Sequence, residues 1–205
     1  MNIIMENSLK NSMSYDGYRD LVKQLADSNS TTGNNKTENL AGYTKLNDRR
    51  MKRLDKTIKI SEVDAKSIKE FHHKITWLVL TESWCGDAAH IIPALNKIAS
   101  LNKNISLRLV VRDDNLDLMD QFLTNGGRAI PKIIMVDDES GDVIATYGPR
   151  PTEATSYVNR FKAMHGQLTD SFKEDLQHWY NTNKGQNVIE DIIDILGKLE
   201  PNVCQ

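Results

Sequence analysis

The sequence predicts an α/β fold in which helices flank a central sheet, with an additional helical arm at the N-terminus and a helical pair at the C-terminus. Short apolar runs rich in β-branched residues alternate with stretches whose apolar residues have helical spacing. This alternation is typical of a sheet covered by helices. The 205 residues are enough for one domain of ordinary size with appendages.

Composition and charge limit the partners that we expect. The formal net charge is −2, so the chain as a whole has no general attraction for nucleic acid. No apolar run approaches the roughly 20 residues of a membrane helix, and residues 1–10 lack the pattern of a signal peptide. We therefore expect a cytoplasmic protein with neither membrane nor nucleic acid as a partner. The sequence does not indicate an oligomeric state.

Residues 1–57 are expected to form the N-terminal arm. Apolar spacing predicts a helix from Tyr15 to Ala26. Residues 27–39 are largely Ser, Thr, Asn and Gly, which indicates a polar linker or mobile loop with little to bury. Residues 41–60 form a basic helix that either meets nucleic acid or an acidic partner, or is a solvated face paired with acidic groups of the chain; we favour the second interpretation.

The central elements follow in order. Ser61 and Asp64 mark a helix start, and His72 and His73 at its end fit a helix-terminal charge role better than a metal site. A buried strand is predicted at 75–81, followed after a turn by an amphipathic helix over 88–99. The later predicted elements are a strand at 105–111, a short helix at 116–123, a hairpin of strands 132–136 and 143–147, and helices at 154–164, 168–179 and 188–199.

Cys85 lies in the turn between the first strand and its helix. Free N–H groups and the helix dipole at such a position favour a thiolate. Asp87 opposes this effect, so the sequence leaves the direction of the pKa shift open; Asp87 itself is either a helix-start carboxylate or a polar group that serves the sulfur. The other cysteine, Cys204, is either an idle terminal thiol or a resolving thiol that folds back onto Cys85.

Residues 58–165 resemble the thioredoxin-fold family. The resemblance rests on Trp84-Cys85-Gly86, on Pro93 eight residues after the cysteine, on Ile130-Pro131 and on Gly148. It implies a cis Ile130–Pro131 bond that faces Cys85, and a substrate groove formed by Trp84, Gly86, Asp87, Ile130, Pro131 and Gly148. The motif Trp-Cys-Gly-Asp-Ala at 84–88 is similar to a bacterial branch of thioredoxin family proteins. On this division residues 166–205 are a C-terminal extension.

Two departures from thioredoxin shape the functional prediction. Ala88 stands where the family has its second cysteine, and Val79 stands where it has a buried aspartate. Without a partner thiol, Cys85 can form a mixed disulfide but cannot release itself by the usual intramolecular step. We therefore predict a cofactor-free monothiol oxidoreductase that acts on protein or small-molecule disulfides and is resolved by an external thiol. The alternative is a non-catalytic binding or adaptor module. Arg128 and Arg150, beside the groove, are expected in surface ion pairs.

Overall fold

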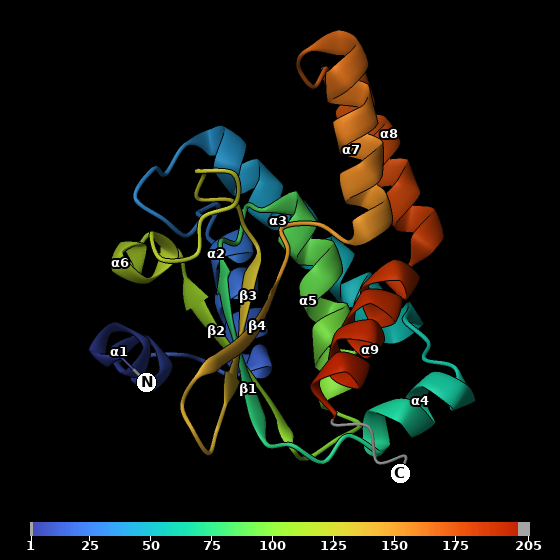
Figure 1. Ribbon diagram of the computed structural model, residues 1–205. Helices are drawn as coiled ribbons and strands as arrows, with labels where there is room; N and C mark the ends of the chain where they lie inside the picture. Colours follow the sequence, from blue (N-terminus) through green and yellow to red (C-terminus); the bar gives the residue numbers. More distant parts are fainter. Residues whose placement is uncertain (1, 201–205) are drawn as a thin grey trace.

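The computed structural model describes residues 2–200 and arranges four strands and nine helices within that range (Figure 1). The strands are β1 (Ile75–Thr81), β2 (Ile105–Val111), β3 (Lys132–Asp137) and β4 (Val143–Tyr147). The helices are α1 (Ile3–Lys10), α2 (Tyr15–Asp27), α3 (Glu38–Thr57), α4 (Glu62–Lys69), α5 (Gly86–Ala99), α6 (Leu116–Met119), α7 (Thr152–His165), α8 (Asp170–Asn183) and α9 (Gln186–Leu199). None of these helices is both long and apolar enough to cross a membrane.

The sheet has the strand order β2-β1-β3-β4. β1 runs parallel to β2, with Ile75 opposite Ile105, and antiparallel to β3, with Leu80 opposite Lys132. A central strand has neighbours on both edges and helices on both faces, and β1 is correspondingly buried at every residue except Thr76. All four strands lie where the apolar runs predicted them.

Helices cover the sheet on both sides. Figure 1 shows α5 and α9 packed together on one side and α1 and α6 on the other. In the N-terminal arm α2 packs on α3, which in turn packs on α5. Tyr18 of α2 and Met51 of α3 belong to the same buried cluster as Trp77 of β1. The predicted α/β fold with flanking helices and additional helices at both ends is confirmed.

Helix α1 is an element that the sequence did not predict. It is short and begins where the Asn2 side chain accepts a hydrogen bond from the Met5 N–H, 2.9 Å away. After it, Met13 and Leu109 exchange two backbone hydrogen bonds of 2.9 Å. The N-terminal segment thus pairs with the outer edge of β2, which would otherwise present unpaired backbone groups.

The polar segment between α2 and α3 is more buried than its composition predicted. Thr31 and Thr32 are both buried. The Thr32 N–H donates to Ser83 Oγ at 3.0 Å, and the Thr32 hydroxyl donates to the carboxylate of Glu82. The expectation of a segment with little to bury is therefore wrong at these two residues, because their side chains complete a polar network on the loop that precedes Cys85.

The basic helix α3 uses several of its charges inside the protein. Its two aspartates, Asp48 and Asp55, pair with Arg19 of α2 at 3.1 and 3.2 Å. Arg53 donates to Asn181 of α8 at 2.6 Å. These contacts tie α3 to both α2 and α8. Within residues 2–200 none of the ion pairs joins a basic side chain of 41–60 to an acidic group, so the favoured interpretation of this helix stays a prediction.

The last three helices divide into two units. Helices α7 and α8 form a hairpin that projects beyond the sheet (Figure 1), with its own apolar cluster of Ala154, Val158, Phe172, Leu176 and Tyr180. Helix α9 instead joins the main core through Val188, Ile189, Ile192 and Leu196. All three helices pack within the chain, as their apolar stripes predicted. The hairpin is a small packing unit held at two junctions.

Candidate functional site around Cys85

Cys85 occupies the N-cap of α5, directly after the loop that ends β1. Its φ and ψ of −73° and 114° are extended, as an N-cap requires. The sulfur accepts a hydrogen bond from the Ala88 N–H at 3.4 Å, and the thiol donates to the Ile130 carbonyl at 3.3 Å. Only 7% of Cys85 is exposed. The sulfur is therefore held between the helix N-terminus and the loop that precedes β3.

That loop carries the second half of the groove expected from the sequence. The Ile130–Pro131 peptide bond is cis, and both residues are buried. Gly148 packs against it with a φ of +103°, and a Cβ on Gly148 would lie 2.3 Å from the Pro131 carbonyl oxygen. Only glycine satisfies both the positive φ and this close approach. Gly148 thus fixes the position of Pro131 beside the cysteine.

Burial and charge keep the Cys85 thiol protonated. The pKa of Cys85 is raised to about 12, first by burial of the sulfur and then by the negative charge of Asp87. The N–H groups of Ala88 and Asp87 and the charge of Arg150 act in the opposite direction, but they do not outweigh burial. The direction of the pKa shift, which the sequence left open, is therefore upward, because the helix N-terminus stabilises the thiolate too little to offset burial.

Asp87 is the centre of a polar cluster at the mouth of the site. Its carboxylate pairs with Arg150 at 2.8 Å and accepts a hydrogen bond from the Tyr180 hydroxyl at 2.8 Å. Burial raises the pKa of Asp87, while Arg150 and Tyr180 lower it. The side chain of Arg150 is 26% exposed and that of Asp87 13%, so this is a sheltered pair rather than the surface pair that we expected. Arg128 does form a surface pair, with Asp120.

Three residues of this cluster were not found from the sequence: His90, Gln177 and Tyr180. The imidazole of His90 stacks on the Tyr180 ring with centroids 4.5 Å apart, and its Nε2 lies 2.7 Å from Gln177 Nε2. The pKa of His90 is lowered to about 3, first by burial and then by the charge of Arg50. It is therefore a neutral packing partner. No local motif marks these residues, since His90 lies on α5 while Gln177 and Tyr180 lie on α8, and the two helices meet only in the tertiary fold.

On its other side, the site is connected to the N-terminal arm. The guanidinium of Arg112 lies 5.3 Å from the centre of the Trp84 ring and pairs with Asp113 at 2.8 Å. Glu82 is fully buried and accepts a hydrogen bond from the Asp113 N–H at 2.9 Å. Burial raises the pKa of Glu82. Trp84 is thus positioned by a network that ends at Thr32.

The structure brings together the residues predicted to surround the cysteine, and it also shows what they lack. The side chains at the two departure positions, Ala88 and Val79, are buried and offer neither a thiol nor a carboxylate. Cys204 lies outside the described residues. Within residues 2–200 no three His, Cys, Asp or Glu side chains cluster as a metal site requires, and His73 lies 4.0 Å from Glu200. Among the described residues, Cys85 is the group capable of thiol chemistry.

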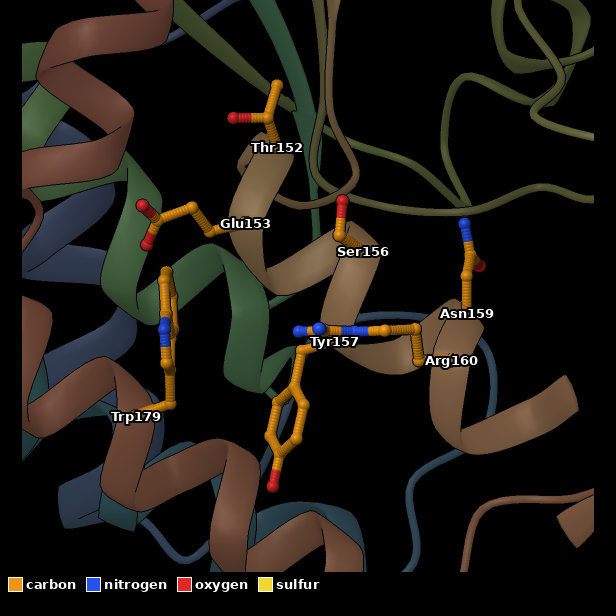
Figure 2. Close-up of a pocket in the computed structure, with 7 residues that line it drawn as sticks. All are labelled: Thr152, Glu153, Ser156, Tyr157, Asn159, Arg160 and Trp179. Atoms are coloured by element: carbon orange, nitrogen blue, oxygen red, sulfur yellow. The ribbon is translucent and has the colours of Figure 1, made fainter. Parts of the chain in front are cut away.

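An open pocket lies away from the sulfur, on the α7–α8 hairpin (Figure 2). In Figure 2, Glu153 of α7 and Trp179 of α8 line it from facing helices. Its other lining residues are Thr152, Ser156, Tyr157, Asn159 and Arg160. None of the residues predicted for the groove lines this pocket, so the hairpin presents a surface separate from the cysteine.

Comparisons with known proteins agree with the architecture. A family model described as Thioredoxin matches residues 33–165. No curated protein matches the chain. The crystal structure of PA1234, a protein of unknown function from Pseudomonas aeruginosa, is similar with a TM-score of 0.64 and 16% identity, covering 94% of this chain and 96% of that one. An HIV epitope-scaffold is similar with a TM-score of 0.57 and 18% identity, covering 91% and 99%. At these identities the two structures support the fold alone.

Proposed function

This chain belongs to the thioredoxin family, and on that premise we propose that it is a thiol–disulfide oxidoreductase of the monothiol type, with Cys85 as its nucleophile. The observation that carries the proposal is the placement of the sulfur at the N-terminus of α5, 3.3 Å from the carbonyl of Ile130 and next to the cis proline Pro131. A disulfide substrate laid along this loop would bring one sulfur in line with Cys85.

The proposed reaction has two exchange steps. The Cys85 thiol loses its proton, and the thiolate attacks one sulfur of the substrate disulfide. A mixed disulfide forms, while the other substrate sulfur leaves as a thiolate and takes up a proton. A low-molecular-weight or protein thiol from outside then loses its proton and attacks the substrate sulfur of the mixed disulfide. A new disulfide joins that thiol to the substrate half, and Cys85 leaves as a thiolate that takes up a proton. No metal or organic cofactor enters these steps.

The environment of the sulfur sets a condition on the first step. A thiol with a pKa of about 12 is almost wholly protonated at neutral pH. The pKa is raised mainly by burial, so exposure of the sulfur to solvent at the mouth of the site lowers it. The attack therefore depends on uncovering Cys85. We place the reaction in the cytoplasm, where reducing thiols are available for the second step.

The direct test is the formation of a mixed disulfide at Cys85. The folded protein is incubated with an excess of 2-hydroxyethyl disulfide and analysed by intact mass and peptide mapping. We expect an adduct at Cys85 that a small thiol removes, no such adduct in Cys85→Ser, and a retained adduct in Cys204→Ser as the matched control. An adduct confined to Cys204 would overturn the proposal.

A second candidate function is a non-catalytic binding module of the same fold. The buried, protonated thiol and the apolar residues Ala88 and Val79 favour it, because none of them supplies a group for the dithiol cycle. The two functions differ in what a partner recognises. A binding module retains its protein partners in Cys85→Ser, whereas an oxidoreductase holds them through the sulfur and loses them in this variant.

A further inference from the structure

Polar contacts join the α7–α8 hairpin to the Cys85 site, beside the stacking of Tyr180 on His90. The Tyr180 hydroxyl donates to Asp87 at 2.8 Å, and Gln177 lies 2.7 Å from His90. Near the same end of α8, Asn181 accepts a hydrogen bond from Arg53 of α3 at 2.6 Å. Polar groups that separate can exchange these partners for water, so such an interface opens at a lower free-energy cost than an apolar one of the same area.

The apolar side chains of the hairpin pack largely on one another. Phe161 stacks on Phe172 with ring centroids 4.0 Å apart, and Tyr157 packs on Phe172 at 4.8 Å. The cluster they adjoin is separate from the main core. Moving the hairpin away from the sheet would leave this cluster intact. The hairpin can therefore move as a unit.

Both ends of the hairpin join the body of the protein while its tip projects beyond the sheet (Figure 1), so such a movement turns about the two junctions. At the start of α7, the hydroxyl and the N–H of Thr152 donate to the two oxygens of Asp191, at 2.6 and 2.9 Å. At the end of α8, Lys184 and Gly185 have φ of +52° and +82°, and a Cβ on Gly185 would lie 3.2 Å from the Cβ of Ala94. These two junctions are the points about which the hairpin can turn.

We propose that the α7–α8 hairpin is a gate over Cys85, with the hydrogen bond between Tyr180 and Asp87 as its latch. In the latched state the cysteine is 7% exposed. Opening withdraws Tyr180 from Asp87 and His90 and exposes the mouth of the site to a disulfide. The gate regulates the reaction proposed above. It rests on that proposal in one respect, because it takes the Cys85 sulfur as the reactive atom.

The test removes the latch and leaves the ring in place. Tyr180→Phe keeps the stacking on His90 but loses the hydroxyl, and it is made in a Cys204→Ser background so that only Cys85 reacts. We expect modification of Cys85 by N-ethylmaleimide at neutral pH to become at least about tenfold faster, because a hydrogen bond to a charged group no longer holds the closed state. Tyr157→Phe is the matched control: it makes the same chemical change inside the hairpin, away from Asp87, and should leave the rate unchanged.

Hydrogen exchange supplies an independent readout. In Tyr180→Phe the amides of α8 should exchange faster while those of α9 do not change. Unchanged exchange of α8 overturns the gate, whether or not alkylation accelerates, since acceleration alone would reflect the pKa of the thiol. Mixed-disulfide formation in a protein that fails this test leaves the oxidoreductase intact. If the hairpin opens but Cys85 forms no mixed disulfide, the proposed oxidoreductase function is overturned and the gate is retained.

Discussion

Asp87 should be the side chain whose charge most restrains the reactivity of Cys85. Its carboxylate raises the pKa of the thiol, second only to burial, and it also neutralises Arg150 at 2.8 Å. Asp87→Asn removes the negative charge, keeps an oxygen for the Tyr180 hydroxyl, and leaves the positive charge of Arg150 facing the sulfur. Both changes favour the thiolate. Nearby charges shift a pKa by about 1 to 3 units, so we expect the pKa of Cys85 to fall by that amount.

The kinetic effect is smaller than the change in the thiolate population. Each unit of pKa raises the population at neutral pH about tenfold, but the less basic thiolate is a weaker nucleophile, with a Brønsted coefficient of about 0.4 to 0.5. The net acceleration of alkylation is therefore about 3- to 50-fold. It is measured with iodoacetamide between pH 7 and 9 in a Cys204→Ser background. Asp175→Asn, an exposed change on α8, should leave the rate unaltered. A rate equal to or below that of the parent would refute this account of the sulfur.

Two further predictions concern stability. Gly148→Ala should lower the free energy of unfolding by at least about 3 kcal/mol, because the positive φ and the contact with the Pro131 oxygen are both incompatible with a Cβ. Gly126→Ala, with φ of +76° and nothing within 4 Å of the added Cβ, should lower the free energy of unfolding by only about 1 to 2 kcal/mol. Both variants are measured by urea titration, and equal losses in the two would contradict the role of the contact between Gly148 and the Pro131 oxygen. Glu82→Gln should flatten the pH dependence of stability. Burial raises the native pKa of Glu82, so its contribution is present below the unfolded pKa near 4.5 and is lost as the pH rises through the native value. Glu139→Gln, at an exposed position, is the control. If the free energy of unfolding of Glu82→Gln depends on pH as steeply as that of the parent, burial of the Glu82 charge is contradicted.

The sequence was most informative where local pattern and tertiary role coincide. The run Ile75–Thr81 is apolar throughout its length, as the central strand of a covered sheet must be, and Gly148 marks a position where the backbone approaches Pro131 too closely for a side chain. In both places the fold requires a particular kind of residue at that position: apolar residues in the strand and glycine at 148. Prediction of the sheet therefore succeeded, and Gly148 and Pro131 lie against each other as the resemblance implied.

The sequence was least informative where a residue depends on a distant partner. Tyr180 lies 93 positions from Asp87 in the chain, and Thr32 lies 50 positions from Glu82. Nothing in a polar run at 28–37 distinguishes threonines that complete a buried network from threonines in a mobile loop. The direction of the pKa shift of Cys85 was open for the same reason, since burial of the sulfur is a property of the fold.

The gate and the missing second thiol are connected through the fate of the mixed disulfide. In a dithiol site the second cysteine releases the substrate from within, so the site does not have to admit another molecule. Ala88 removes that route, so in the proposed monothiol cycle the resolving thiol comes from outside. Cys85 is 7% exposed in the latched state, so on the proposed gate an adduct forms only when the hairpin is open. The adduct itself therefore holds the hairpin open and leaves the mixed disulfide accessible until the external thiol arrives, after which Tyr180 can return to Asp87.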